Sequence, residues 1–212
     1  MNAVFRTTLA SLFALALGAC NVIPEPEQVR VYPLRVAPVT ASEQTFSGTL
    51  RVAEPTALSA LDTPRIAVYQ TDGRQAYWQG VRLQDRVPLV VQDHVLRALQ
   101  ESRMVQHVID DRSGSTYHFE LQTHIEAFGI QSEQPKVATV VLRTQLRSAH
   151  DRQVLATRRF SVQSEVAPEQ AGSQLTAPEL HALSLSLQAV QQEMITWLEQ
   201  NLGNQAQVTT ND

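Results

Sequence analysis

The sequence predicts a single α+β domain in which an antiparallel β-sheet is covered by two α-helices. Residues 117–162 contain three long segments in which apolar and polar residues alternate, as expected of strands with one buried face. Residues 86–102 and 177–202 instead repeat apolar residues every three or four positions, as expected of helices with one apolar stripe. The expected divisions are a cleaved signal peptide (1–19), a lipidated and proline-containing tether (20–48), the domain (49–202) and a disordered tail (203–212).

The first twenty residues have the pattern of an export signal. Arg6 precedes an apolar stretch that starts at Leu9, and the run LGAC closes it at residues 17–20. A helix of about 11 residues spans less than about 20 Å, whereas the hydrocarbon layer of a bilayer is roughly 30 Å thick. We therefore expect this segment to be removed rather than to span the membrane.

Cys20 is the single cysteine of the chain, and the run before it resembles the lipobox of bacterial lipoproteins. The resemblance implies cleavage between Ala19 and Cys20, a diacylglyceryl group on the thiol and a further acyl chain on the new amino terminus. Each buried methylene adds about 0.8 kcal/mol of membrane affinity. Asn21 stands where enteric bacteria place Asp for inner-membrane retention, so the resemblance points to the outer membrane. A chance cysteine after an ordinary secretory signal is the alternative.

Charge and cysteine content exclude several classes of protein. The 212 residues carry a formal net charge of −4 with no basic stripe, so we expect no nucleic-acid partner. An exported chain without a second cysteine has no internal disulfide, and apolar packing must stabilise the fold. The only bound group that the sequence predicts is the covalent lipid on Cys20.

The elements before the first helix are short strands. Residues 49–52 and 65–69 are β-prone runs near prolines, and Asp72-Gly73 supplies a tight turn before a returning strand at residues 75–78. We expect them to form a compact β unit. Within the otherwise extended tether, residues 31–36 could form an edge strand, where a proline is tolerated.

Helix boundaries follow from capping residues. The first helix is expected to start after Asp85 as N-cap, with Pro88 in its first turn. The second is expected to end at Gly203. The apolar stripe of the first comprises Val91, Val95, Leu96 and Leu99, and that of the second comprises Leu180, Leu183, Leu187, Val190, Met194, Trp197 or Leu198, and Leu202.

The long strands are expected to bury one face each, with residues 150–153 as the hairpin between the last two. His118 and His124, on the polar face of the first, would lie about 20 Å apart along an extended strand. This distance is too long for one metal ion, so we expect a solvated face and no metal site. The apolar faces carry Tyr117, Phe119, Leu121, Thr123 and Ile125, then Ala138, Val140, Leu142 and Leu146, then Ala156, Phe160 and Val162, and the polar face carries His118, Glu120, Gln122, His124 and Glu126.

No catalytic motif stands out. The chain lacks a G-x-S-x-G frame, a P-loop, an H-E-x-x-H helix and paired cysteines, and a loop explains the stretch SGS at residues 113–115 better than a nucleophile turn does. We therefore expect no enzyme activity and no catalytic residues. Tyr77, Trp78 and Trp197 could contact a lipid or a partner, with packing in the core as the alternative.

Residues 30–202 resemble the ABC-type transport auxiliary lipoprotein component family, the periplasmic lipoproteins that accompany MCE-type lipid transporters. The chain departs from the family pattern at Leu83, where a Trp usually precedes the first helix, although Trp78 could fill that space. The matching stretches are TLRV at 49–52, LDTPRIAV at 61–68, VQ at 91–92, LRAL at 96–99, YHFEL at 117–121, VLA at 154–156 with Phe160, and WL at 197–198.

The resemblance implies a lipid-anchored protein on the periplasmic face of the outer membrane. Its implied partners are an MCE-domain protein, an ABC permease and the ATPase that hydrolyses ATP for phospholipid transport. A homo-oligomer would suit an MCE hexamer. A structural lipoprotein that assists outer-membrane protein assembly or envelope integrity is the alternative, and a lipid-anchored hydrolase using Ser113 or Ser115 is a third hypothesis.

Overall fold

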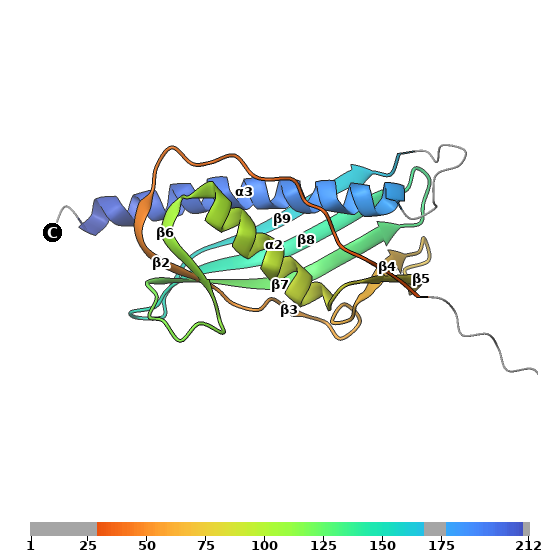
Figure 1. Ribbon diagram of the computed structural model, residues 1–212, viewed down its shortest axis with the longest axis horizontal. Helices are drawn as coiled ribbons and strands as arrows, with labels where there is room; N and C mark the ends of the chain where they lie inside the picture. Colours follow the sequence, from red (N-terminus) through yellow and green to blue (C-terminus); the bar gives the residue numbers. More distant parts are fainter. Residues whose placement is uncertain (1–28, 168–176, 210–212) are drawn as a thin grey trace, which may run out of the picture.

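One layer of β-strands lies under two α-helices, and both helices pack on the same face of the sheet (Figure 1). This computed structural model describes residues 29–167 and 177–209. The prediction of a single α+β domain with two helices over a sheet is confirmed. The elements are β1 (Arg30–Tyr32), β2 (Phe46–Val52), β3 (Thr56–Ala57), β4 (Arg65–Tyr69), β5 (Gln75–Leu83), α2 (Val87–Ser102), β6 (Val105–Asp110), β7 (Phe119–Gln131), β8 (Val137–Ser148), β9 (Val154–Glu165) and α3 (Ala177–Thr209).

The long strand β7 organises the sheet. One of its edges pairs with β8 in antiparallel fashion, and β8 pairs with β9 in the same way. The other edge is occupied end to end by three short strands, β2, β3 and β4, all parallel to β7. Beyond these, β6 extends the sheet from β2, and β5 and then β1 extend it from β4. The prediction of an antiparallel sheet is confirmed for the long strands, but the whole sheet is mixed because the short strands add parallel pairs.

The parallel pairs arise from a crossover that the sequence did not reveal. After β2 the chain passes through β4, β5 and α2 before β6 returns beside β2 in the same direction, and parallel neighbours need such a crossover. The strand β6 was missed, although Val105, Val108 and Ile109 are β-branched. The predicted compact β unit does not form, because β2 pairs with β6 and β7, whereas β4 and β5 pair with each other.

Local hairpin signals were reliable. The turn at Asp72 and Gly73 joins β4 to β5, and Gly73 has the positive φ of 81° that such a turn requires. Residues 150–153 join β8 to β9, as predicted. The edge strand expected within residues 31–36 is present as β1, which pairs with β5 at the border of the sheet.

Helix α2 begins one residue later than its capping signal suggests. Arg86 occupies the N-cap position without a side-chain cap, and the Asp85 carboxylate accepts only the amide N–H of Arg86, at 2.7 Å. The amide of Val87 instead donates to the carbonyl of Thr63 at 3.1 Å, so the preceding loop replaces a side-chain cap. Pro88 lies in the first turn, as predicted.

Helix α3 continues past Gly203 to Thr209, so the predicted stop and the start of the disordered tail were wrong. A glycine inside a helix costs only about 1 kcal/mol relative to alanine, and docking can outweigh that cost. A Cβ at Gly203 would lie 3.8 Å from the Phe46 ring, which places this turn of the helix close to the start of β2.

A β-bulge in β7 changes which residues face the helices. The register with β8 shifts between Ile125 and Ala127, which leaves Glu126 as the extra residue. Ile125 is buried before the bulge, whereas Phe128 and Ile130 are buried after it. The alternation that the sequence predicts therefore holds up to the bulge and is inverted beyond it.

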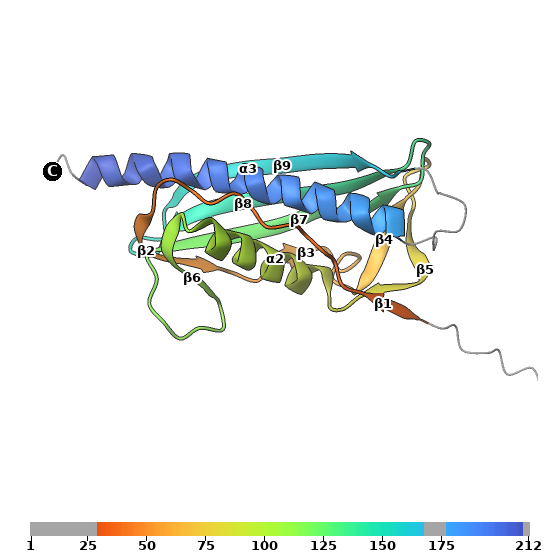
Figure 2. The ribbon, with the colours of Figure 1, turned by 45° about the horizontal axis from the view of Figure 1, so that its top comes forward.

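Residues 33–45, called the crossing segment below, run between the two helices from β1 to β2 (Figure 2). Leu34 is 5% exposed and belongs to the core, and the amide of Ser42 donates to the carbonyl of Ser102 at 2.7 Å. The expectation of a tether that buries nothing was wrong for this part, because every second side chain near Leu34 turns towards the helices. Leu34 is the apolar residue that anchors it.

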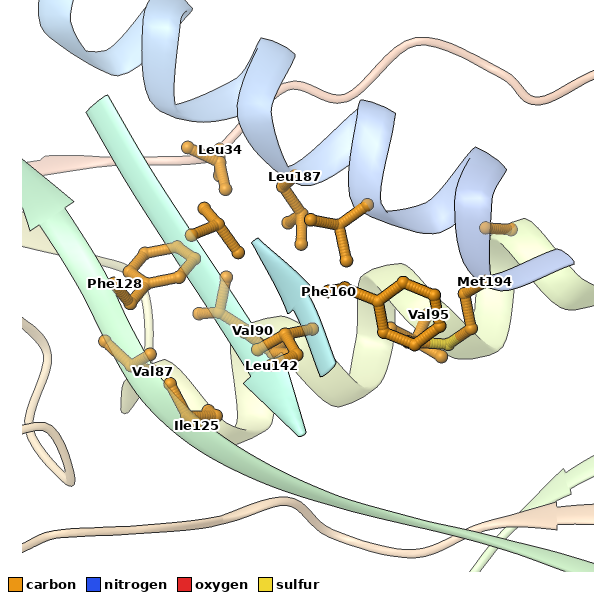
Figure 3. Close-up of a cluster of buried hydrophobic side chains, with 14 of the residues drawn as sticks. Leu34, Val87, Val90, Val95, Ile125, Phe128, Leu142, Phe160, Leu187 and Met194 are labelled. Carbon is orange, nitrogen blue, oxygen red and sulfur yellow. The ribbon is translucent and has the colours of Figure 1, made fainter. Parts of the chain in front are cut away.

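The core lies between the sheet and the helices. Figure 3 shows side chains from α2, α3 and the sheet meeting there, with Leu34 of the crossing segment among them. The ring of Trp197 packs edge-on against Phe160, with the ring centroids 5.7 Å apart. The predicted apolar faces of both helices are buried as expected, except that Leu96 of α2 is only half-buried.

Candidate functional site

The sheet face opposite the helices, called the outer face below, is lined by polar side chains of β7, β8 and β9. The strand register aligns them in cross-strand rows, and the apolar residues that alternate with them on β7 and β8 belong to the core. The predicted polar face of the first long strand is therefore present, although Glu120 is only 8% exposed. The outer face comprises Glu120, Gln122, His124, Glu126, Arg143, Gln145, Arg147, Thr157 and Arg159.

The two histidines of the first long strand contact neighbouring strands. The Nδ1 atom of His118 accepts the amide N–H of Thr49 at 3.0 Å, and Nδ1 of His124 lies 3.0 Å from Oγ1 of Thr56. Within the part of the chain that the structure describes, no group of three or more His, Cys, Asp or Glu side chains could hold a metal ion.

Glu126 joins three strands through two arginines. Its Oε1 accepts from Nε of Arg143 on β8 at 2.7 Å, and its Oε2 accepts from Nε of Arg159 on β9 at 2.6 Å. The hydrogen bond from Arg159, supported by Arg143, holds the pKa of the Glu126 carboxyl below its ordinary value. The bulge places this carboxylate where it can reach both strands, and the outer face keeps an excess of positive charge around it.

The clefts of the described residues are polar. Four of them have volumes between about 350 and 470 Å³, and polar or charged side chains make up most of the lining of each. Lipid-binding pockets are lined mainly by apolar side chains. None of the four clefts is lined mostly by apolar residues, as such a pocket would be.

The three aromatic side chains predicted as contacts lie in different places. The Tyr77 hydroxyl donates to the carbonyl of Ala60 at 2.9 Å, and its ring lies 3.9 Å from the Arg65 guanidinium. Trp78 is half-buried and packs against the core. Trp197 is 6% exposed and belongs to the core. The fold does not bring the three together into one patch.

The predicted lipidation site lies outside the described residues. Ala19 and Cys20 precede residue 29, so the cleavage and acylation of this segment stay predictions. None of the helices in the described part is long and apolar enough to cross a membrane. Ser113 and Ser115 lie in the loop between β6 and β7, where the Ser115 amide donates to Oγ of Ser113 at 3.4 Å.

The arginines of the outer face were not recognised as candidate residues from the sequence. Arg143 and Arg147 alternate with buried Leu142 and Leu146 on β8, and this alternation is the signal that could have identified them. Their convergence on acidic and amide partners of β7 depends on the strand register, which the alternation alone does not specify.

No protein-family model matches this chain, and no curated protein matches it either. Among solved structures, protein XCC0632 from Xanthomonas campestris, which carries the family label DUF330, is similar over 84% of this chain and 99% of its own, with a TM-score of 0.73 and 26% sequence identity. An uncharacterized protein is similar over 81% of this chain and 99% of its own, with a TM-score of 0.63 and 9% identity.

More distant matches include lipoprotein GNA1162 from Neisseria meningitidis, at a TM-score of 0.29 and 11% identity over 70% of this chain and 98% of its own. A TM-score this low carries no weight for fold or function. The similarity to XCC0632, by contrast, extends along nearly the whole length of that protein and is accompanied by 26% sequence identity.

Proposed function

We propose that this protein is a lipoprotein anchored in the outer membrane through Cys20 and exposed to the periplasm. In this proposal it is the accessory component of an MCE-type ABC system that moves phospholipid between the inner and outer membranes. It performs no catalysis itself, and its only bound group is the covalent lipid. The partner ATPase supplies the energy.

Two observations support the family assignment behind this proposal. The lipobox-like run at residues 17–20 supplies the anchor. The stretches that resemble the auxiliary lipoprotein family lie in elements that build one core, and the side chains of Phe160 and Trp197, from two of those stretches, are in direct edge-to-face contact. Such a shared core supports a common fold more strongly than a common mechanism.

The polar lining of the clefts is the observation that favours docking over carrying. A protein that carries phospholipid must shield two acyl chains from water, and burial of apolar surface is the force that would do so. In the described residues most large apolar side chains pack in the core between sheet and helices, and polar or charged residues predominate in the lining of the four clefts. We therefore assign the protein a docking role, with the outer face as the surface that receives the MCE assembly.

Acylation is the first test of this proposal. Mass spectrometry of the full chain purified from membranes should show residues 1–19 removed and the mass of the lipid on Cys20. A C20A variant should leave the membrane fraction. An unmodified Cys20 thiol in the exported protein would contradict the proposed anchor.

Co-purification is the second test. The tagged full chain, extracted in mild detergent, should recover an MCE-domain protein and its permease. The charge reversal Arg143→Glu on the outer face should reduce this recovery at least five-fold. Arg74→Glu, an exposed arginine paired with Asp72 in the turn between β4 and β5, is the matched control. Recovery of an outer-membrane barrel protein without any MCE subunit would instead support the structural alternative.

A further inference from the structure

A groove on the outer face has three arginines among its eight lining residues. It includes the turn between β8 and β9, which lies at the end of the sheet away from β1 (Figure 2). It has a volume of about 370 Å³ and is called the arginine groove below. Its walls come from β2, β7, β8 and the turn between β8 and β9. The lining residues that matter are Arg51, Tyr117, Glu120, Gln122, Arg147 and Arg152.

The lining side chains form one hydrogen-bonded chain. Arg51 Nε donates to Oε1 of Glu120 at 3.0 Å, and Gln122 Nε2 donates to Oε2 of the same carboxylate at 2.8 Å. Arg147 donates to Oε1 of Gln122 at 3.1 Å and to the carbonyl of Arg152 at 3.2 Å. Because neighbouring groups fix each other, the guanidinium groups of Arg51 and Arg147 are held in place before any ligand arrives.

The arginine groove has more positive charge than its own carboxylate can neutralise. Glu120 is the single acidic residue among those that line it, against three arginines, and both of its oxygens already accept hydrogen bonds. Arg147 has only the neutral oxygens of Gln122 and Arg152 as acceptors, and its Nε is buried without a partner in the described structure. A buried donor without a partner is destabilising, and an acceptor in the groove would offset that cost.

Two further contacts orient charged side chains in and beside this groove. The Arg51 guanidinium lies 3.9 Å from the centre of the Tyr117 ring, which fixes its plane along one wall. The nearby Asp151 carboxylate accepts from the Gln153 amide at 3.1 Å, and its hydrogen bond with Ser148 holds its pKa below the ordinary value. Asp151 is therefore held within the turn, and it is not among the residues that line the groove.

We propose that the arginine groove binds a phosphate group. Guanidinium groups donate pairs of parallel N–H bonds that match phosphate oxygens. A phosphate has oxygens pointing in several directions and can meet arginines from opposite walls, whereas a carboxylate offers a single fork. The phosphate comes either from a lipid headgroup or from a free phosphate compound. This site does not depend on the proposed transport role or on Cys20.

Calorimetric titration of the full chain with inorganic phosphate, at constant ionic strength, tests the proposal. The wild type should bind phosphate saturably. R147Q should bind it at least about ten-fold more weakly, as expected for the loss of a hydrogen-bonded charge, and R152Q several-fold more weakly. R74Q, which removes an exposed arginine paired with Asp72 elsewhere, should bind as the wild type does.

The outcomes separate the sources of phosphate. Glycerophosphoglycerol, a lipid headgroup without acyl chains, should bind more tightly than inorganic phosphate if the site takes a headgroup, and more weakly if it takes free phosphate. No saturable binding by the wild type, or equal affinities in R147Q, R152Q and R74Q, would overturn the site. Should R147Q fail to fold by circular dichroism, the exposed Arg152 decides the question alone.

Discussion

Gly129 is the position where a single methyl group should disturb the sheet most. It pairs with Ala67 where β4 meets β7, and a Cβ at this position would lie 2.3 Å from the carbonyl oxygen of Ala67 and 2.9 Å from its Cβ. Ordinary van der Waals contacts are 3.4–4 Å, so the two backbones would have to separate by about 1 Å. Because the obstacle is backbone rather than a flexible side chain, no rotamer change can relieve it.

Gly129→Ala should therefore lower the free energy of unfolding by about 3 kcal/mol, the upper end of the range for overpacked cores. In a domain of this size that loss corresponds to a decrease in Tm of about 6–12 °C. Urea unfolding followed by circular dichroism measures the free energy, and thermal unfolding measures Tm. Gly114→Ala is the control, because a Cβ there meets nothing within 4 Å, and it should change stability by less than about 0.5 kcal/mol. If Gly129→Ala is as stable as Gly114→Ala, the close approach of β4 and β7 is incorrect.

Three further predictions concern packing and pH. Trp197→Ala should lower the free energy of unfolding by about 3–5 kcal/mol, because it removes a buried side chain in edge-on contact with Phe160. Trp78→Ala, at a half-buried position, should lower it by less when both variants are unfolded in urea. Burial lowers the pKa of His94, so below about pH 6.5 the unfolded chain binds more protons than the folded chain. The free energy of unfolding should therefore fall as the pH drops further. His94→Gln should remove this dependence on pH in unfolding curves measured from pH 7 to 5. Glu126→Gln should lower the free energy of unfolding by at most about 1 kcal/mol at pH 7, because the arginine partners of Glu126 are solvent-accessible. The difference in stability from the wild type should vanish in acid, as the pH falls through the lowered pKa of the carboxyl. A difference that stays constant down to pH 2 would contradict the ion pairs.

Local signals in the sequence identified most elements but few of their partners. The stripe through Leu183, Leu187 and Val190 was sufficient to predict a helix that buries one face, and the turn at Asp72-Gly73 was sufficient to predict a hairpin, because both depend on residues close in the chain. The position of β6 beside β2 was not predictable in this way. It depends on the crossover through α2, and the contacts that select it join residues 58 positions apart, such as Leu50 and Val108.

For the outer face, too, the sequence indicated which residues are exposed but not which residues they contact. The alternation of Arg143 and Arg147 with buried leucines was visible in the sequence, but their partners were not, because a one-residue change of register would exchange the two faces of the strand. The bulge at Glu126 is such a change, because it exchanges the two faces for the residues of β7 that follow it.

By itself, the sequence determined the α+β class, the two helices and the long alternating strands, because each depends on local periodicity. Acylation of Cys20 stays a prediction from a contiguous motif. The tertiary structure alone decided the mixed sheet, the burial of Leu34 between the helices and the assembly of the arginine groove from β2, β7 and β8. The physical reason is that these features depend on which distant segments pair and in which register. That choice is made by the free energy of packing the whole core rather than by any segment alone.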